Sequence, residues 1–434
     1  IETLVNKLSL LIILLLFINN CSIKKSKDLF SKKTINTKKI ENVKTILTKQ
    51  ARKELEFNPN LKIKFSDINF NKSTENNQND LGNIFYEGAL KKIGKYKFSK
   101  FNDFKYINVK PLFYNKNVIF FDNKGAIIFY DQNEKKIWKK NYYNKYEKKL
   151  KPRLNFAQKD KILIVADDIA KYYAIDIETG NLLWTKTNIV PFNSEIKVKD
   201  NIFYVVDYKN ILRAISIIDG SEVWSIKTEE SLTKSGTKTS VIIKENTIYF
   251  NNSIGDVTAV NLKTGQLIWQ LPTQNNNISK NAFQLSNSEM IINENSIFFS
   301  NNKNEFYSID TSTGLINWKN EINSENRPII IGKFIITISK KGYLYLVDKK
   351  SGNIIRVNNL YKNYKNKNNI YPTGFLVAKN KIYLSNNDGK LIIVDLDNVN
   401  TINTAKIART KILQPLVHNN NLFLISNGSI IKFN

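Results

Sequence analysis

The fold is indicated by a twelve-residue stretch, YAIDIETGNLLW, at residues 173–184. The same pattern returns as TAVNLKTGQLIW at 258–269 and as YSIDTSTGLINW at 307–318. Each copy has Asp or Asn at its fourth position, Gly at its eighth and Trp at its twelfth. Self-similarity with a period of about 40 to 50 residues is typical of propeller blades or solenoid units. The chain is therefore predicted to be a repeat protein.

Weaker copies of the pattern fill the intervals between and around these three. They lie at residues 129–138, 213–224, 346–356 and 393–403. The first lacks the Gly, the second has Ser216 in place of Asp, the third keeps Asp348 and Gly352 but has Arg356 in place of Trp, and the last keeps only Asp395. All five tryptophans of the chain occupy one repeat position: Trp138, Trp184, Trp224, Trp269 and Trp318.

Each repeat predicts a four-stranded antiparallel blade. A strand such as residues 161–166 is followed by a tight turn, a second strand, the Asp-x-x-x-Gly turn, a third strand ending in Trp, and a polar connector to a weaker fourth strand. In that turn the carboxylate accepts backbone N–H groups and Gly takes a left-handed conformation. The residues expected to have this structural role are Asp176, Gly180, Asn261, Gly265, Asp310, Gly314, Asp348 and Gly352. The tryptophans are expected to pack between neighbouring blades, with a partner for each indole N–H.

The repeats predict a closed ring, because a blade has apolar surface on both sides and only closure buries all of it. Residues 421–433 supply the first two strands of a unit and then the repeat stops. The missing strands are expected from the N-terminal side, at residues 61–70 and 85–101. The predicted fold is an all-β propeller over residues 61–434, with eight four-stranded blades closed by pairing of N- and C-terminal strands.

The N-terminal residues predict export and a lipid anchor. Lys7 precedes a charge-free apolar run of about eleven residues at 8–18, shorter than the ~20 residues of a membrane-spanning helix. Residues 1–20 are therefore predicted to be a signal peptide. Cys21, the single cysteine, follows where a bacterial lipoprotein carries its acyl chains, although Asn20 replaces the usual Gly or Ala. An ordinary signal peptide with an incidental cysteine, or a short uncleaved anchor, remain alternatives.

Residues 21–60 are rich in Lys and Asn and are predicted to be a lipidated tether. Ser22 after the cysteine, rather than Asp, favours the outer membrane, so the expected location is its periplasmic face. The formal charge is +28, but lysines are spread through every segment. We therefore expect general attraction to anionic lipid and no nucleic-acid partner.

Cysteine and histidine are almost absent, with Cys21 and His418 the only residues of each type. No intrachain disulfide, Cys/His zinc set or histidine-based triad can form from one of each. His418 lies in an Asn-rich stretch and is expected to be an exposed structural residue. The sequence thus predicts no catalytic, metal or cofactor site.

The x-Ala-x-Asp-x-x-Thr-Gly-x-x-x-Trp unit resembles the quinoprotein (PQQ-like) propeller repeat over residues 80–434. Two groups of proteins carry it: quinoprotein alcohol dehydrogenases and the BamB-like lipoproteins of the outer-membrane β-barrel assembly machinery. The dehydrogenases place a vicinal cysteine pair against the quinone, and this chain has a single cysteine. The chain is similar to the second group, which joins a lipidated cysteine to eight blades.

This resemblance implies a non-enzymatic scaffold, a monomeric subunit of a larger complex, that binds the barrel-inserting subunit. The implied contacts are the loops after the third and fourth repeats, at residues 230–238 and 284–289. Their candidate residues are Leu232, Thr233, Lys234, Asn287 and Glu289. Two alternatives stay open. A quinoprotein-like dehydrogenase relative needs an acid, base or metal at the ring axis, and a surface carbohydrate-binding propeller needs exposed aromatic residues on one face.

Overall fold

The computed structural model describes residues 54–65, 83–229, 237–273, 285–364 and 367–434. Contacts group Glu54–Asn434 as one compact unit. The predicted signal peptide, Cys21 and most of the predicted tether lie outside the described residues, as do Leu232, Thr233 and Lys234. Within the described residues, no helix has the length and apolar character needed to cross a membrane. The boundaries predicted at residues 20 and 60 stay predictions.

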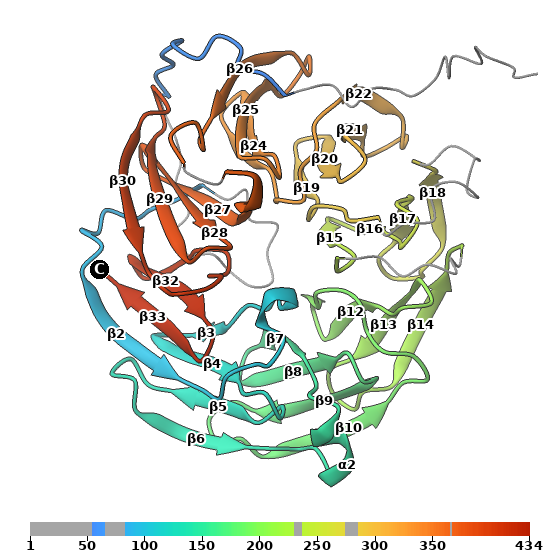
Figure 1. Ribbon diagram of the computed structural model, residues 1–434. Helices are drawn as coiled ribbons and strands as arrows, with labels where there is room; N and C mark the ends of the chain where they lie inside the picture. Colours follow the sequence, from blue (N-terminus) through green and yellow to red (C-terminus); the bar gives the residue numbers. More distant parts are fainter. Residues whose placement is uncertain (1–53, 66–82, 230–236, 274–284, 365–366) are drawn as a thin grey trace, which may run out of the picture. The chain divides into compact units, whose positions relative to one another are not determined.

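The unit is an eight-bladed β-propeller, as predicted, with eight sheets arranged in a ring (Figure 1). Blade 1 contains β3 (Leu112–Tyr114), β4 (Asn117–Phe121), β5 (Ile127–Tyr130) and β6 (Lys136–Lys140), and blade 2 contains β7 (Leu154–Lys159), β8 (Ile162–Asp167), β9 (Lys171–Asp176) and β10 (Leu182–Thr187). Blade 3 contains β11 (Lys197–Lys199), β12 (Ile202–Val206), β13 (Ile211–Ser216) and β14 (Glu222–Lys227), and blade 4 contains β15 (Val241–Lys244), β16 (Thr247–Asn251), β17 (Val257–Asn261) and β18 (Leu267–Leu271).

Blade 5 contains β19 (Ile291–Asn293), β20 (Ser296–Asn301), β21 (Glu305–Asp310) and β22 (Ile316–Asn320), and blade 6 contains β23 (Ile329–Ile331), β24 (Phe334–Ile338), β25 (Tyr343–Asp348) and β26 (Ile354–Asn359). Blade 7 contains β27 (Pro372–Ala378), β28 (Lys381–Asn386), β29 (Lys390–Asp395) and β30 (Thr401–Lys406), with the short β1 (Asn83–Ile84) parallel to β27. Blade 8 contains β31 (Leu416–His418), β32 (Asn421–Ser426), β33 (Ser429–Phe433) and β2 (Lys92–Lys97). The described helices are α2 (Lys145–Lys149) and the 3-10 turns η1 (Phe104–Tyr106) and η2 (Lys367–Asn369).

The middle strands of a blade are apolar on both faces because each sheet lies between two others. In blade 2, β8 is buried at every position after Ile162, whereas β10 is exposed everywhere except at Trp184. A short continuous apolar run is typical of a strand covered on both faces. The core is therefore a set of apolar clusters between blades, such as the one that joins Ile164 of blade 2 to Val205 of blade 3.

The predicted order of strands within a blade needs correction. The fourth strand, reached by the polar connector after Trp, is the inner strand of the next blade rather than the last strand of its own. Trp184 lies in β10 at the outer edge of blade 2, and β11 pairs with β12 of blade 3. Inner strands as short as the three residues of β11 carry too little pattern to show which neighbour they pair with.

The closure of the ring also differs from the prediction. The C-terminal segment supplies three strands of blade 8 rather than two, and β2 supplies only the outer one, with Tyr96 opposite Ile430. The unpredicted strand is β31, whose three residues carry no repeat signature. Residues 61–65, the described part of the predicted strand at 61–70, form no strand.

Residues 54–65, called here the N-terminal strap, contact the outer edge of blade 6. Phe57 and Val357 exchange two backbone hydrogen bonds, of 3.1 and 2.8 Å. Arg356 donates to the carbonyl of Leu61 at 2.6 Å, and the Ile63 N–H donates to the carbonyl of Asp397 in blade 7 at 3.2 Å. The strap therefore spans the junction between blades 6 and 7.

Each repeat tryptophan lies against the turn of the following blade. Four indole N–H groups donate to a backbone carbonyl there: Trp138 to Ile177 (2.8 Å), Trp184 to Ile217 (2.8 Å), Trp269 to Thr311 (2.9 Å) and Trp318 to Lys349 (3.0 Å). A methyl group added to Gly220 would lie 2.7 Å from the indole of Trp184. The conserved spacing of Trp and Gly within the repeat thus corresponds to a contact between two blades.

Candidate functional site at the ring axis

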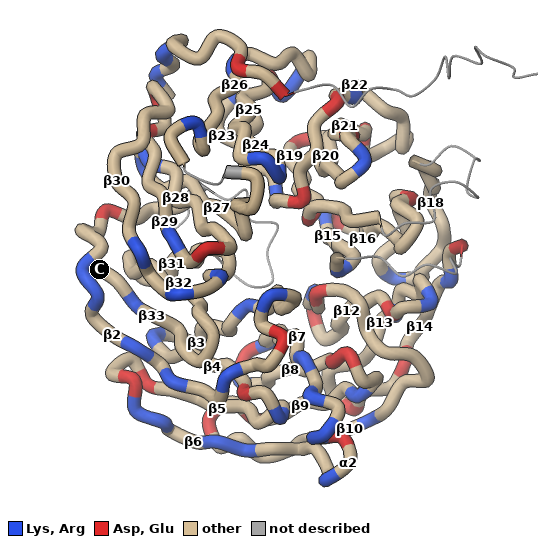
Figure 2. The backbone as a smooth tube through the Cα atoms, in the orientation of Figure 1, with Lys and Arg blue, Asp and Glu red and all other residues tan. Residues whose placement is uncertain are grey.

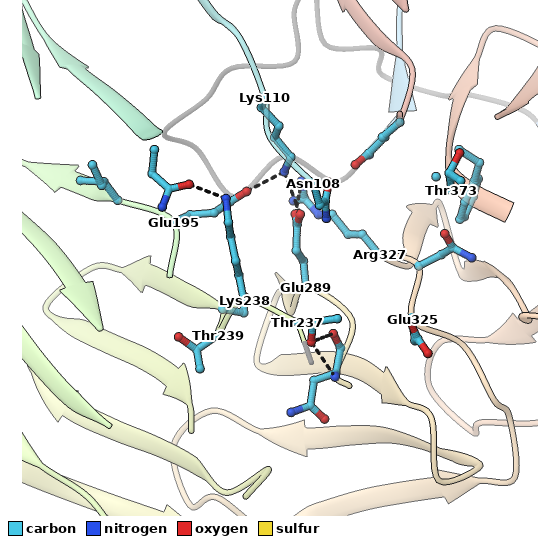
Figure 3. Close-up of a pocket in the computed structure, with 18 of the residues that line it drawn as sticks. Asn108, Lys110, Glu195, Thr237, Lys238, Thr239, Glu289, Glu325, Arg327 and Thr373 are labelled. Atoms are coloured by element: carbon cyan, nitrogen blue, oxygen red, sulfur yellow. Dashed lines mark hydrogen bonds and ion pairs between the residues drawn. The ribbon is translucent and has the colours of Figure 1, made fainter. Parts of the chain in front are cut away.

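A cavity of about 100 Å³ lies at the ring axis (Figure 3). Every blade contributes to its lining from the residues that precede or open its inner strand. One lining residue per blade, from blade 1 to blade 8, is Lys110, Asn155, Glu195, Lys238, Glu289, Arg327, Thr373 and Gln414. Loops at the ends of many strands converge at such an axis, which makes it the place to look for a binding or catalytic site.

The central group of the cavity is Lys110, which lies between two glutamates in Figure 3. Its Nζ is 2.7 Å from Oε1 of Glu195 and 2.8 Å from Oε1 of Glu289. The second oxygen of Glu195 is 3.6 Å from Nζ of Lys197, and that of Glu289 is 3.9 Å from Nη1 of Arg327. Ion pairs therefore connect blades 1, 3, 5 and 6 across the axis.

The pairing fixes the protonation of these groups. Burial alone would raise the pKa of Glu195, but Lys110 and Lys197 outweigh it and hold that pKa well below its usual range. Burial would likewise lower the pKa of Lys110, but Glu195 and Glu289 hold it above its usual value. The Glu195 carboxylate and the Lys110 ammonium therefore stay ionised at neutral pH, and the ion pair between them stays intact.

Lys238 is the exception among the cations of the cavity. Its Nζ donates to the amide oxygen of Asn155 in blade 2, a neutral partner. Burial lowers the pKa of Lys238 to about 8. The axis thus presents one amine whose positive charge is not balanced by a carboxylate at hydrogen-bonding distance among the described residues.

Glu325, the remaining carboxylate of the lining, pairs with Lys340, which lies outside the cavity, at 3.5 Å. A general acid or base needs a proton-exchanging atom directed at a substrate, and here the carboxylates of Glu195, Glu289 and Glu325 each face a cation of the chain. The described residues include no group of three or more His, Cys, Asp or Glu side chains that could hold a metal ion. The arrangement is suited to joining blades across the axis.

Two of the five predicted partner-binding residues fall within the described chain, and both lie at the axis. Glu289 belongs to the ion-pair network. Asn287 is 4% exposed, and its backbone N–H and carbonyl both bond to the hydroxyl of Thr237, at 3.1 and 3.0 Å. The structure therefore brings residue 287 against the end of the other predicted contact loop. It places neither residue on the outer surface of the ring.

The axial network was not predicted, although the sequence holds a signal for it. Four charged residues each stand two positions before an inner strand: Lys110, Glu195, Glu289 and Arg327. Aligning the connectors between repeats, as well as the repeats themselves, would have shown this recurrence. The sequence does not show which of these residues form pairs, because partners such as Lys110 and Glu289 are 179 residues apart.

A second missed repeat position is the turn between the two middle strands of each blade. In blade 2, Asp167 Oδ1 accepts the N–H groups of Ile169 and Lys171, and Oδ2 accepts the hydroxyl of Tyr143 at 2.5 Å. Burial raises the pKa of Asp167 to about 6. This position holds Asp, Asn or Ser in different blades, so no single residue type marks it.

His418 is partly buried rather than simply exposed. Its ring stacks on Phe113 of blade 1 with centroids 4.6 Å apart and an interplanar angle of 8°. Its Nε2 contacts the carbonyl oxygen of Asn115. His418 thus packs across the junction between blades 8 and 1, which is a structural role.

Comparison with known proteins identifies the family. The profile of the family described as outer membrane protein assembly factor BamB matches residues 123–358, more than half of the chain. This chain belongs to the BamB family. The match spans blades 2 to 5 completely, together with the two outer strands of blade 1 and nearly all of blade 6.

Individual BamB relatives are distant. The BamB protein of Legionella pneumophila (strain Paris) is 24% identical over 122 residues, which cover 26% of this chain and 30% of the relative. That of Moranella endobia (strain PCIT) is 24% identical over 171 residues, covering 38% of this chain and 44% of the relative. The matched segments thus span less than half of either relative.

Solved structures share the BamB-type fold. BamB from Moraxella catarrhalis superposes with a TM-score of 0.67 at 14% identity, covering 80% of this chain and all of that one. The designed protein Ika8 gives 0.59 at 12% identity, covering 78% and 99%. A quinohemoprotein alcohol dehydrogenase from Pseudomonas putida HK5 gives 0.59 at 11%, covering 80% and 76%. At these identities the likeness shows the fold alone, and the fold is shared with an enzyme.

Proposed function

We propose that this chain is a non-catalytic scaffold lipoprotein of the outer-membrane β-barrel assembly machinery. It is anchored through Cys21 on the periplasmic face of the outer membrane and binds the barrel-inserting subunit. The observation that carries the proposal is the BamB family match over residues 123–358, which includes both predicted contact loops. The lipid anchor rests on the position of Cys21 directly after the apolar run.

The axial network supports a scaffold rather than an enzyme. Glu195 and Glu289 share Lys110, so these three charged groups face one another across the axis instead of facing a substrate. A rigid ring holds its connectors at fixed positions, which favours binding a partner with little loss of conformational entropy. The dehydrogenase alternative has fold likeness in its favour, but no described pair of groups at the axis is arranged for proton transfer.

The proposed interface lies on the face of the ring where outer strands lead into the inner strands of the next blade. The connector from β14 to β15 contains Leu232, Thr233 and Lys234, and the connector from β18 to β19 contains Asn287 and Glu289. Glu289 is committed to Lys110 and Arg327. We therefore assign direct contact to the 232–234 segment, and assign Asn287 and Glu289 the role of supporting the adjacent loop.

Site-specific photocross-linking tests this interface. A photoreactive residue at position 232 or 234 of the full chain, expressed in cells, is expected to cross-link to the barrel-inserting subunit. The matched control is position 219, in the exposed turn that precedes the same outer strand at the opposite face of the ring. Equal cross-linking from 219 and 232, or cross-linking from 219 alone, would contradict the assigned face.

A second experiment separates contact from support. The triple variant Leu232→Ala, Thr233→Ala, Lys234→Ala is expected to lower co-purification of the partner without changing the melting temperature. Glu289→Gln is expected to lower the melting temperature as well, because Lys110 loses one of its two carboxylates. Undiminished co-purification with both variants would remove these loops from the interface.

A further inference from the structure

Some of the lysines that look dispersed in the sequence lie together on two adjacent outer strands of the ring. β2, the outer strand of blade 8, and β6, the outer strand of blade 1, each contain three lysines and are preceded by one or more others. We define the basic strip as Lys91, Lys92, Lys95, Lys97, Lys135, Lys136, Lys139 and Lys140. Figure 2 shows these cations along β2 and β6. The two blades touch, since the Tyr130 hydroxyl bonds to the carbonyl of Lys97.

The strip is exposed and poorly neutralised. Seven of its eight lysines are exposed, Lys140 being partly buried. Lys139 pairs with Asp122 at 2.7 Å and Lys140 donates to the amide of Asn181, but in the described chain the remaining six form no ion pair with a carboxylate. Residues 91–100 contain no Asp or Glu, and the one acid of residues 135–151, Glu147, pairs with Lys171. The turn before β6 supplies Asp131 and Glu134, so with Asp122 three carboxylates lie beside the eight lysines. The positive charge of the strip therefore faces solvent.

No other blade has this feature. The outer strands β10, β14, β22 and β30 contain one lysine each, β18 contains none, and the only cation of β26 is the buried Arg356. A general excess of lysine in the chain would have enriched all eight outer strands alike. The ring consequently has one strongly cationic side.

Apolar side chains stand between these lysines. Ile93 of β2 is 44% exposed and Ile137 of β6 is 48% exposed. Helix α2, which follows β6, adds exposed Tyr146 and Leu150 beside its own three lysines. Lysine with exposed aliphatic and tyrosine side chains is a composition suited to a membrane interface, where apolar parts enter the headgroup region and ammonium groups reach phosphates.

We propose that the basic strip binds the anionic phospholipid surface of a bilayer and so turns the outer edge of blades 8 and 1 toward the membrane. The binding is electrostatic, with a small apolar contribution from Ile93 and Ile137. It depends on neither the barrel-inserting subunit nor acylation of Cys21. For an anchored chain it would fix the orientation of the ring as well as its distance from the bilayer.

Two features of the strip favour lipid over an acidic protein or a nucleic acid. The cations are all lysines, flexible point charges without the planar fork that recognises individual carboxylates or phosphates. The strip runs along the outer edges of two blades, where the strands present side chains outward. Lipid headgroups move laterally within a flat surface, so they can reach lysines that are spread along such an edge. Clustered lysines near anionic lipid contribute to binding individually and additively, with strong dependence on salt.

Lysine footprinting of the full chain tests the proposal directly. The chain is reconstituted in nanodiscs of phosphatidylcholine alone or with phosphatidylglycerol, acetylated briefly, and digested for mass spectrometry. The six unpaired lysines of the strip are expected to lose at least about half of their reactivity in the anionic discs, and high salt is expected to restore it. Exposed control lysines elsewhere on the ring should not change: Lys186, Lys227, Lys263 and Lys350. Equal reactivity in both discs, or protection of the controls instead, would overturn the proposal.

A charge-removal variant supplies the second readout. The change Lys92→Gln, Lys95→Gln, Lys135→Gln, Lys136→Gln is compared with the same change at the four control lysines. The measured quantity is the ratio of vesicle binding with phosphatidylglycerol to binding without it, and this ratio is compared between the two variants, which share the same N-terminal segment. The strip variant is expected to lower this ratio about tenfold or more, and the control variant to leave it within twofold. If the strip variant instead keeps the ratio and loses a protein or nucleic-acid partner, the strip is not a lipid site. Co-purification of the barrel-inserting subunit is measured separately, so the two proposals fail independently.

Discussion

The guanidinium of Arg356 donates to the backbone carbonyl of Leu396 at 3.1 Å, just as the indole of Trp138 donates to the carbonyl of Ile177. Arg356 stands opposite Leu346 beside a bulge, the register that Trp184 has opposite Ala174. The turn that Arg356 meets has Val399, with φ of 56°, where blades 2 to 6 have Gly. Loss of the tryptophan in one blade thus accompanies loss of the glycine in the next.

The junction between blades 8 and 1 repeats this relationship. Gly94 occupies the tryptophan's register position in β2, and Glu134, with φ of 62°, occupies the glycine's place in the following turn. A methyl group on Gly94 would meet the Glu134 carboxylate. The Trp and Gly of this repeat are therefore one packing unit shared by two blades, and both members change together.

Adding a methyl group to one of these glycines tests the packing unit. Gly220→Ala is expected to lower the free energy of unfolding by about 2–4 kcal/mol, since it combines a left-handed backbone with a clash against Trp184. Gly332→Ala is the matched control, with φ of 56° and nothing within 4 Å of the added methyl. Gly332→Ala should lower the free energy of unfolding only by the cost of placing Ala in a left-handed backbone conformation, about 1 kcal/mol. If urea unfolding gives the same loss of unfolding free energy for both variants, the contact with Trp184 adds nothing to the cost of Gly220→Ala.

Removing the Arg356 guanidinium is expected to release the N-terminal strap. Arg356 is 1% exposed and donates to the carbonyls of Leu61, Leu396 and Asp397. Arg356→Met should cost about 2 kcal/mol, because the carbonyls of Leu61 and Leu396 lose the guanidinium donor, the second of them in a buried position. Hydrogen exchange at Phe57 and Val357 should accelerate. Arg153→Met, at a side chain 40% exposed, is the control. Unchanged exchange at Phe57 would mean that the strap is held by other contacts.

The stability of the ring should depend on the ionisation of Asp167. Its pKa is about 6 in the folded chain and about 3.9 when unfolded, so the folded state binds more protons between these values. The free energy of unfolding therefore falls as pH rises from 4 to 6, and at pH 7 the folded chain bears the full cost of the ionised, buried carboxylate. Blade 7 has Asn386 at this position, accepting the Tyr361 hydroxyl at 2.6 Å.

Asp167→Asn is expected to remove that dependence while keeping the turn. Relative to the unmodified chain, the variant should gain about 1–3 kcal/mol on going from pH 4 to pH 7, as measured by urea unfolding at both values. If the free energies of unfolding of the variant and the unmodified chain differ by the same amount at pH 4 and at pH 7, the pKa of Asp167 is not raised in the folded chain.

The axial ion pairs should contribute more than those at the surface. Lys110→Met leaves Glu195 and Glu289 without their shared cation, with an expected cost of about 1–3 kcal/mol. Lys161→Met removes an exposed pair with Glu178, where both side chains are at least half exposed, and should leave the free energy of unfolding almost unchanged. A Lys110 variant as stable as the Lys161 variant would show that the network does not join the blades.

The propeller was predictable because rare residues recur at fixed spacing, and Trp184 and Gly180 identify a blade without reference to its neighbours. The closure was predicted only in outline, because β31 has three residues and resembles no repeat. The position of the strap could not be predicted from the sequence either, because Phe57 pairs with Val357, which is 300 residues away in the chain. The axial site depends on pairs such as Lys110 and Glu289, which the ring brings together and local sequence cannot.

The most direct test of the scaffold assignment is affinity capture of the tagged full chain from detergent-solubilised membranes, with mass spectrometry of the bound proteins and a Cys21→Ser control. We expect recovery of the barrel-inserting subunit and its companions, with a lower yield from the Cys21→Ser chain. Their absence, together with enrichment of a quinone or a polysaccharide, would contradict the scaffold role and favour an enzyme or a carbohydrate-binding protein.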